Sequence, residues 1–372
     1  MSNRDFENIR PFFDSEVGDI VKKLAVSLDW VKLMSPIIGH DNAVEIAEAM
    51  PHVESIEEFQ DELTSPFLEA LIEGTTAGVT VSFENEDLDY YFSQPILHLS
   101  NHKDIVLDPS LVNLARMGNG YPSTQVGIGD NLLTQKWVEN LVRLNKCFVV
   151  PRSGSARDKL NSSLLVASYI RHVVKEGGAV WLAQREGRAK DGKDATSPAL
   201  IRMLISEGGR DSWEVLRVCP ISISYEWDPC DGLKVRELLV TERDGGYSKS
   251  PGEDELSMAL GLTEFKGRVH LHFSNPIPWS EKEGERTERV IATKVDNAIY
   301  KGYKIFPNQM LSAEKLGLDI TLNVEITTRD RQEFEERLGK VVEFVGDEFT
   351  REEIEKKWCE ITAQPLLTQL AV

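Results

Sequence analysis

The chain has 372 residues, with 42 Lys and Arg against 61 Asp and Glu, which gives a formal net charge of −19 at pH 7. This acidic balance argues against a nucleic-acid-binding protein, because phosphate backbones are bound by basic faces. The sequence has no run of about 18 apolar residues, so no transmembrane helix is expected. The N-terminus lacks the pattern of a signal or transit peptide. The four cysteines are not paired at C-x-x-C spacing, which favours a cytoplasmic protein.

Residues 1–76 are expected to form an acidic helical bundle that packs on the rest of the chain. Apolar residues recur at near-helical spacing over residues 15–33, and similar patterns cover residues 41–50 and 55–72. The polar faces of these helices are acidic, which argues against their lying on a membrane surface.

Residues 77–305 alternate between short apolar runs and helical patterns, which is typical of an α/β domain. The expected strands cover residues 79–83, 96–99, 125–128, 147–150, 179–183, 216–225, 233–241 and 269–273. The expected helices cover residues 105–117, 131–144, 156–175, 197–206 and 280–300. This order predicts a mixed, mainly parallel sheet flanked by helices, with the more closely spaced later strands adding an antiparallel part.

Residues 306–372 are expected to form a charged helical C-terminal region. Apolar residues are spaced among many Glu, Lys and Arg over residues 328–361, which predicts one or two amphipathic helices that cover the domain or a partner. Residues 245–254 are rich in Gly, Ser and Pro and are expected to form a loop.

Polar and charged residues follow three of the expected strands. They are His102, Asp104 and Asp108 after the first, Arg152 after the second, and Arg185, Glu186, Gly187, Arg188 and Lys190 after the third. In a parallel sheet the loops after the strands gather at one edge, where ligands bind. An imidazole beside carboxylates and several cations fits a phosphorylated alcohol, since His can remove a hydroxyl proton while Arg and Lys bind phosphate. In the same part of the acidic chain, residues 131–205 carry 13 Lys and Arg against 6 Asp and Glu, which also indicates an anionic ligand.

In order and spacing these blocks resemble the glycerol-3-phosphate and 1-acylglycerol-3-phosphate acyltransferase superfamily. The first block of that family, N-H-x4-D, is similar to the segment from Asn101 to Asp108, and the second is similar to the strand that ends at Arg152. The third, V-W-L-A-Q-R-E-G-R-A-K, is most similar to the soluble plastid-type enzymes, and the fourth is similar to V-C-P-I at residues 218–221. The resemblance spans roughly a third of the chain.

One position departs from the family pattern. The family has Asp five positions after the His, where this chain has Leu107. Asp108 and Pro109 resemble an Asp-Pro pair of the plastid-type branch, so we expect Asp108 to partner His102, with Asp104 as the alternative. The Asp that does not partner His102 is then expected to cap a helix or to interact with its dipole.

The resemblance implies direct acyl transfer from acyl-CoA or acyl-carrier protein to a hydroxyl of glycerol 3-phosphate or its 1-acyl ester. His102 would act as general base, and Arg152, Arg188 and Lys190 would hold the phosphate of the acceptor. Arg185, Glu186 and Gly187 would support that site. Neither a metal nor a cofactor is implied beyond the thioester co-substrate.

Other functions remain open from the sequence. The chain could act on another alcohol acceptor, hydrolyse thioesters, or bind phospholipid without catalysis, and a peripheral contact with a membrane would be compatible with each. Some residues also have structural interpretations. His98 lies in an apolar strand and fits the core, Arg185 and Glu186 fit a surface ion pair, and His270 and His272 lack a neighbouring ligand for a metal.

Overall fold

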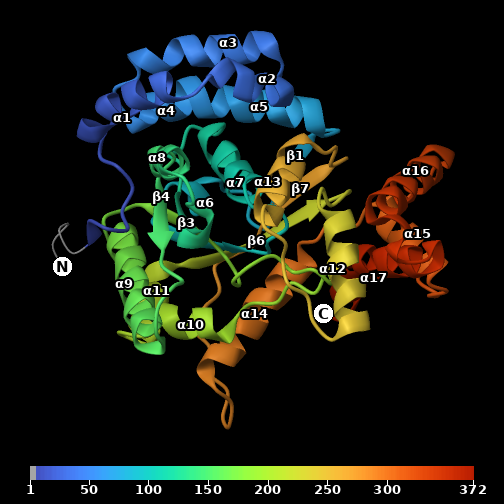
Figure 1. The fold of residues 1–372 in the computed structure, drawn as a ribbon. Helices are drawn as coiled ribbons and strands as arrows, with labels where there is room; N and C mark the ends of the chain where they lie inside the picture. The colour runs from blue at the N-terminus through green and yellow to red at the C-terminus, as the bar shows by residue number, and fades with distance from the viewer. Residues whose placement is uncertain (1–5) are drawn as a thin grey trace.

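Seven strands form one sheet in the computed structural model, which describes residues 6–372 (Figure 1). They are β1 (Val79–Phe83), β2 (Ile96–Ser100), β3 (Gln125–Gly129), β4 (Cys147–Val150), β5 (Ala179–Ala183), β6 (Val218–Tyr225) and β7 (Val269–Phe273). The order across the sheet is β1-β7-β6-β2-β5-β3-β4. The strands β6, β2, β5, β3 and β4 are parallel, β7 is antiparallel to β6, and β1 is parallel to β7. The expected mixed, mainly parallel sheet is confirmed.

Helices cover both faces of the sheet, so its central strands are apolar on both sides. All residues of β2 and β6 are buried, whereas the edge strand β1 is half exposed. One face packs against α7 (Leu107–Met117), α8 (Lys136–Leu144) and the N-terminal helices. The other face packs against α9 (Ala156–Lys175), α10 (Pro198–Leu204), α11 (Arg210–Leu216) and α14 (Thr287–Lys301).

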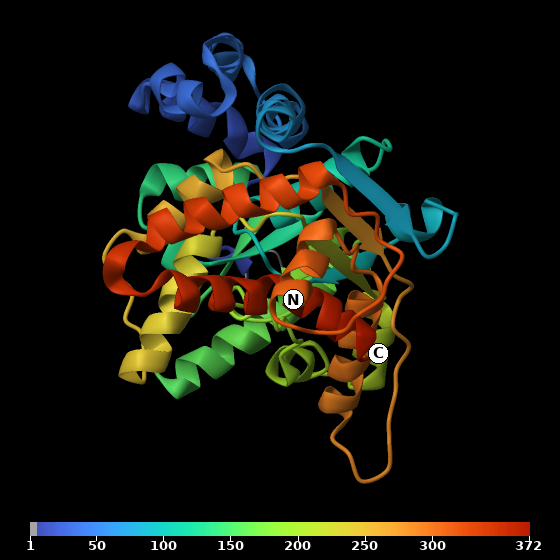
Figure 2. The ribbon, with the colours of Figure 1, turned by 90° about the vertical axis from the view of Figure 1, so that its right-hand side faces the viewer.

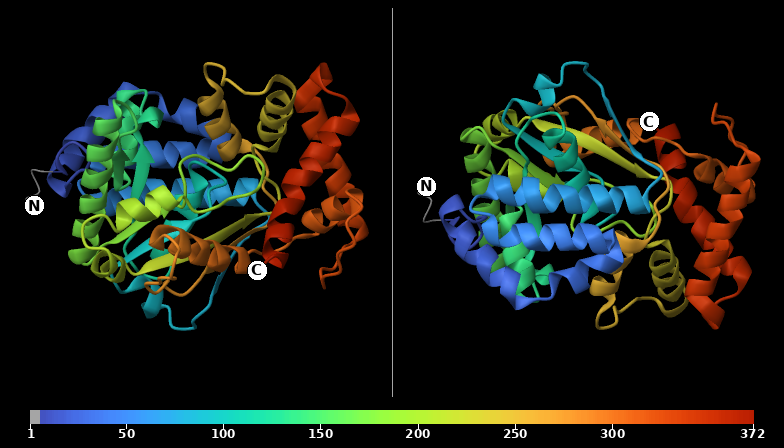
Figure 3. Two further views of the ribbon diagram at one scale, coloured as in Figure 1. Left: turned by 90° about the horizontal axis from the view of Figure 1, so that it is seen from below. Right: turned by 90° about the horizontal axis from the view of Figure 1, so that it is seen from above.

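The N-terminal helices precede the first strand, as expected. They are α1 (Asp14–Ser27), α2 (Trp30–Ile38), α3 (His40–Ala49), α4 (Ile56–Phe59) and α5 (Ser65–Thr75), and a short helix, α6 (Asp89–Phe92), follows β1. In Figure 1 the helices α1 to α5 form the blue layer above α7 and α8. The view from above in Figure 3 shows this layer lying across the molecule. Their apolar faces share one core with α7 and the sheet, which attaches this layer to the α/β part.

The C-terminal helices pack against one another and against α12 (Asp231–Asp244). They are α15 (Pro307–Lys315), α16 (Thr328–Val345) and α17 (Arg351–Leu370), and Figure 2 shows α16 and α17 side by side on one flank of the molecule. A buried polar cluster joins them to α12: Arg337 donates two hydrogen bonds to Asp231 at 2.8 and 2.9 Å, and Trp358 Nε1 donates a third at 3.0 Å. The expected amphipathic helices therefore cover the α/β part, through α12.

One expected strand is wrong: residues 233–241 lie inside the helix α12. The apolar residues of this segment fit a helix because Val235 and Leu239, four positions apart, share one buried face. That face packs in the core formed by α16 and α17, more than 90 residues away in the sequence. The helix ends at Gly245, which has a left-handed backbone (φ 77°).

Two further differences concern helices. The sequence pattern did not predict α13 (Glu253–Thr263), and the helix expected from residue 280 begins at Thr287. None of the described helices combines the length and the apolar character needed to cross a bilayer. The division of the chain into domains at residues 76 and 305 stays a prediction.

Candidate active site

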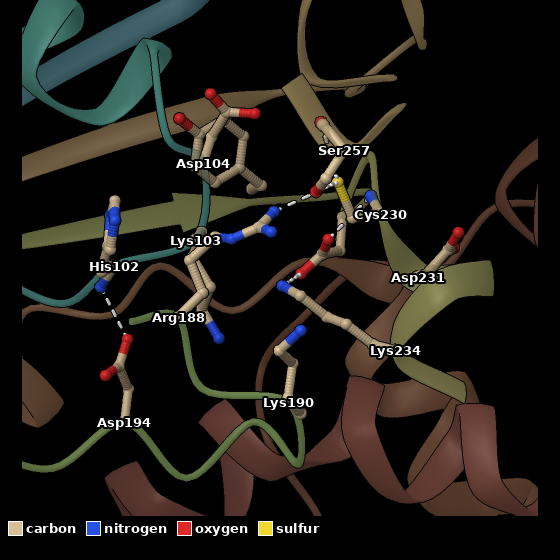
Figure 4. Close-up of polar contacts among 12 residues, drawn as sticks. His102, Lys103, Asp104, Arg188, Lys190, Asp194, Cys230, Asp231, Lys234 and Ser257 are labelled. Carbon is tan, nitrogen blue, oxygen red and sulfur yellow. Dashed lines mark hydrogen bonds and ion pairs between the residues drawn. The ribbon is translucent and has the colours of Figure 1, made fainter. Parts of the chain in front are cut away.

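The loops that follow β2, β5 and β6 meet at one edge of the sheet. These strands are neighbours and parallel, so their carboxyl ends lie together. Figure 4 shows side chains of these loops, with His102 on one side and a group of lysine and arginine side chains beside it. The residues predicted after the first and third strands are thus neighbours in the structure.

His102 is hydrogen-bonded to Asp108, not to Asp104. Its Nδ1 lies 2.9 Å from Oδ2 of Asp108, which is fully buried. A carboxylate accepts at this contact, so the proton is assigned to Nδ1. The Nε2 atom has no hydrogen-bond partner among residues 6–372, and the His102 side chain is 15% exposed. With Nδ1 bound to Asp108, Nε2 is the ring nitrogen that can act as a base toward solvent or a substrate.

Asp108 accepts three further hydrogen bonds that fix its position. Its Oδ2 also accepts the backbone N–H of Lys103 at 2.7 Å and that of Asp104 at 3.0 Å. Its Oδ1 accepts the hydroxyl of Tyr225 at 2.8 Å. Asp108 also lies in the first turn of α7, where the helix dipole favours a negative charge. The carboxylate is held rigidly, and through it the ring of His102.

Asp104 caps α7. Its Oδ1 accepts the backbone N–H groups of Val106 and Leu107 at 2.8 and 2.7 Å, which would otherwise lack partners at the helix start. Burial raises the pKa of Asp104, and the nearby Asp108 adds to this, while the two backbone donors oppose it. The two acids thus have separate contacts: one orients the imidazole and one starts the helix.

Asn101 anchors the segment that carries His102. Its side-chain amide forms two hydrogen bonds with the backbone of Ile223, with Nδ2 donating to the carbonyl and Oδ1 accepting the N–H, both at 2.8 Å. Asn101 is fully buried. The side chain thereby continues the pairing of β2 with β6 beyond the end of the strand, which fixes where the next residue begins.

Asp194 accepts a hydrogen bond from the backbone of His102. Its Oδ2 accepts the N–H of His102 at 2.6 Å, although the two residues are 92 positions apart (Figure 4). Asp194 is 1% exposed, and its Oδ1 has no partner within the described part of the chain. The ring of Trp181 lies edge-on to that of His102, with centroids 6.0 Å apart. Sequence analysis missed Asp194, and no motif at its position could have indicated it.

Tyr225, the last residue of β6, is the second residue that sequence analysis missed. The fourth sequence block covers residues 218–221 at the start of this strand and does not reach the tyrosine. Burial raises the pKa of Tyr225 well above its usual value, and Asp108 and Asp104 add to this. The hydroxyl stays protonated and donates to Asp108.

Several cations gather beside the His102–Asp108 pair. A narrow cleft of about 10 Å³ is lined by Arg188, Lys190, Cys230, Leu233, Lys234, Lys249, Glu253, Asp254 and Ser257. Figure 4 shows the nitrogen ends of Lys103, Arg188, Lys190 and Lys234 directed toward the same space. A cavity of this volume holds about one water molecule, so an anion enters only if some of these long side chains move.

The cations of this cleft differ in whether a carboxylate already neutralises them. Lys190 Nζ lies 2.6 Å from Glu237, Lys249 lies 2.5 Å from Asp254, and Lys234 is paired with Asp228. Within residues 6–372, the guanidinium of Arg188 donates only to the sulfur of Cys230, at 3.4 Å. Lys103 is not among the residues that line the cleft. Its side chain has no hydrogen bond and no ion pair in the described residues, and burial, with Lys234 nearby, lowers its pKa. Arg188 and Lys103 are therefore the cations most available to an anion.

Arg152 lies apart from this cleft. It follows β4, which is separated from β2 by β5 and β3 in the sheet. Its guanidinium pairs with Glu186 at 3.6 Å and packs against Gly129, where a Cβ would meet it at 2.6 Å. The exposed pair contributes about 0–1 kcal/mol.

The other residues of the third block form the turn before Arg188. Gly187 has a left-handed backbone (φ 68°), which lets the loop turn back after the exposed Glu186. Arg185 has no ion pair among residues 6–372 and does not line the cleft. Of the three predicted phosphate ligands, only Arg188 and Lys190 line the cleft.

The other histidines have structural contacts. His98 is fully buried in β2 beside Arg116, at 3.4 Å. His270 and His272 hydrogen-bond through their rings to Thr80 and Ser82 of the neighbouring strand. No group of three or more His, Cys, Asp and Glu side chains in the described chain could hold a metal ion.

Comparisons with known proteins find similarity at the level of solved structures only. No family model and no curated protein matches the sequence. Among solved structures, the chain is similar to the 1-acyl-sn-glycerophosphate (LPA) acyltransferase PlsC from Thermotoga maritima, with 13% identity and a TM-score of 0.34, over 77% of this chain and 97% of that chain. A similarity at this level does not carry a function, so the function of this chain is argued from its own site residues.

Proposed function

We propose that this chain is an O-acyltransferase that moves a fatty acyl group from an acyl-CoA or acyl-carrier-protein thioester to a hydroxyl of glycerol 3-phosphate or 1-acylglycerol 3-phosphate. The observation that supports this most directly is the His102–Asp108 pair. In the part of the chain that the structure describes, Nε2 of this imidazole has no hydrogen-bond partner, and cations without a carboxylate partner lie beside it.

The proposed reaction needs a single base and no covalent enzyme intermediate. Nε2 of His102 removes the proton of the acceptor hydroxyl while that oxygen attacks the thioester carbonyl. The tetrahedral intermediate collapses, the C–S bond breaks, and the imidazolium returns the proton to the leaving thiolate. The Asp108 carboxylate stabilises the imidazolium, while its bond to Nδ1 keeps Nε2 free for the hydroxyl.

The cations position the acceptor rather than take part in bond making. Arg188 and Lys103 would bind its phosphate, since neither must first give up a carboxylate. Lys190 would contribute after releasing Glu237. Holding the phosphate places the hydroxyl near His102, which lowers the entropy cost of the attack.

The direct test is acyl transfer from palmitoyl-CoA to glycerol 3-phosphate and to 1-acylglycerol 3-phosphate, with product measured by chromatography. His102→Ala should lower kcat by about 10²–10⁴-fold. His52→Ala is the matched control, since His52 is exposed on the N-terminal layer and should keep full activity. Unchanged turnover in His102→Ala would remove His102 from the chemistry. Acceptor binding without turnover in the wild type would favour a binding protein, and thioester loss without ester formation would favour a hydrolase.

A second test separates the phosphate role from general damage. Arg188→Ala and Lys103→Met should each raise the KM for the phosphorylated acceptor about tenfold or more and leave the KM for the thioester within a few-fold. The control is Lys136→Met, because that lysine is 74% exposed on α8. Equal effects on both substrates would contradict a phosphate role for these cations.

A further inference from the structure

A second cavity lies at the amino ends of the parallel strands, whereas His102 lies at their carboxyl ends. It has a volume of about 360 Å³ and is lined by Phe92, Ser93, Arg116, Tyr121, Pro122, Ser123, Gln125, Lys146, Val173, Gly177, Gly178 and Ala179. These residues immediately precede or begin β2, β3, β4 and β5, or lie on the ends of α7 and α9. Because the four strands are parallel, this edge is separated from the candidate active site by the length of the strands.

The charge of this cavity is positive in a strongly acidic protein. Two of the described lining residues are cations, Arg116 and Lys146, and none is acidic. The remaining wall includes the apolar surfaces of Phe92, Tyr121 and Val173, together with the polar side chains of Ser93, Ser123 and Gln125. A site with cations at one part and hydrocarbon around it is complementary to an organic anion.

Arg116 is buried and has no carboxylate partner among the described residues. It is 2% exposed, and its guanidinium donates to the backbone carbonyls of Pro122, Phe92 and Tyr91 and contacts the ring of His98. Those four contacts leave one of the five guanidinium N–H groups for a ligand. Burial lowers the pKa of Arg116 to about 10, which reflects the missing negative partner. A neutral His98 cannot supply that charge, since burial and Arg116 lower its pKa well below the usual value.

Lys146 supplies the second cation. Its side chain has no hydrogen bond or ion pair among the described residues; Glu57, Asp14 and Asp61 act on it only at a distance. Lys146 lies in the turn between α8 and β4, and its backbone is left-handed (φ 57°). This conformation is unfavourable for a residue other than glycine. A free ammonium on a strained turn, facing a cavity, is consistent with a role in binding.

We propose that this cavity binds a small organic acid, with its carboxylate between Lys146 and Arg116 and its apolar body against Phe92, Tyr121 and Val173. The available donors are one guanidinium N–H and an unpaired ammonium, which suits the two oxygens of a carboxylate. The volume of about 360 Å³ falls within the range of about 300–1,000 Å³ of small-molecule sites and leaves room for a medium-chain or aromatic acid. The site is separate from the proposed acyl-transfer site and does not depend on that function.

The test is isothermal titration calorimetry of the full chain with sodium octanoate. Wild type should bind octanoate saturably, and octylammonium, which has the same chain and the opposite charge, should not bind. Lys146→Asn removes the ammonium with a residue that tolerates the left-handed turn, and should weaken octanoate at least about tenfold. Ser93→Trp places a large ring in the mouth of the cavity from an exposed position and should weaken it similarly. The control Lys136→Gln removes an exposed charge on α8 and should leave affinity within twofold.

Each remaining outcome would overturn the assignment. Absence of saturable octanoate binding to the wild type would remove the site. Octanoate affinity within twofold of wild type in either Lys146→Asn or Ser93→Trp would place the ligand elsewhere. Inorganic phosphate binding as tightly as octanoate would show that an anion alone is recognised and would exclude an organic acid as the preferred class.

Discussion

Exchanging each of the two acids near His102 for asparagine separates their roles. Asp108→Asn keeps the shape of the side chain but removes its charge. Asparagine has one acceptor oxygen with two lone pairs, whereas Oδ2 of Asp108 accepts from three donors: Nδ1 of His102 and the backbone N–H groups of Lys103 and Asp104. At least one buried donor therefore loses its partner.

The expected cost of Asp108→Asn is large in both stability and rate. One unsatisfied buried donor costs about 1–3 kcal/mol of folding free energy. Loss of the orienting carboxylate should lower kcat by about 10²–10⁴-fold, which corresponds to about 3–5 kcal/mol in the activation barrier. Asp104→Asn should behave differently, because an asparagine oxygen can still accept the N–H groups of Val106 and Leu107. It should keep kcat within a few-fold of wild type.

The assay combines urea unfolding, followed by circular dichroism, with acyl transfer at saturating acceptor and thioester. Activity is measured only at temperatures where each variant is folded, so that the loss in kcat is not a loss of folded protein. If Asp104→Asn lowered kcat as much as Asp108→Asn, or if Asp108→Asn kept kcat within threefold of wild type, the assignment of Asp108 as the partner of His102 in catalysis would be refuted.

Three further results are expected around the same group. Tyr225→Phe removes one hydroxyl donor to Asp108 and should lower kcat about tenfold while leaving both KM values near wild type, as measured by steady-state kinetics. Because burial raises the pKa of Asp104, the folded chain holds that proton more tightly than the unfolded chain, and ionisation costs stability as the pH rises. Asp104→Asn should therefore unfold at higher urea than wild type at pH 7, with the difference shrinking as the pH falls toward 3.8, the ordinary value; a difference independent of pH would contradict this. Gly261→Ala places a Cβ against the carboxylate of Asp104 and should lower the urea midpoint. In Gly339→Ala nothing lies within 4 Å of the added Cβ, so this variant should raise the free energy of unfolding by about 0.5–1 kcal/mol. Equal shifts in the two variants would show that helix propensity alone decides the change in stability.

Most of the sheet could be predicted because its strands carry the signal themselves. The strand β2 is a short apolar run buried on both faces, and apolar runs of this length bounded by turn residues indicate strands. The error at residues 233–241 came from a segment in which a strand and a helix bury apolar residues about equally well. The helix is decided by α16 and α17, which supply the apolar surface and the Arg337–Asp231 pair. Such distant partners are not visible in a local pattern.

The site divides in the same way. The distance from His102 to Asp108 spans six residues, so a local motif could suggest the pair. Tyr225 and Asp194 reach the same group from 117 and 92 positions away, and neither lies at a spacing that carries information. They are placed by the neighbouring strand β6 and by the loop after β5. Sequence reasoning finds the proposed His102–Asp108 pair, while the residues that hold this pair in place follow from the topology.

The pairing of cations is a third property that residue type does not determine. Lys190 matches a basic position of the family motif, yet Glu237 lies 2.6 Å from its ammonium, so a phosphate must compete with an internal carboxylate. To bind a phosphate, Arg188 would give up only a hydrogen bond to a weak sulfur acceptor. Lys103 would give up no hydrogen bond or ion pair within the described residues. Binding at Lys190 therefore returns less free energy than binding at the two unpaired cations. Under the proposed function, binding of the acceptor phosphate should depend most on Arg188 and Lys103, although Lys103 stands at a variable position of the first block.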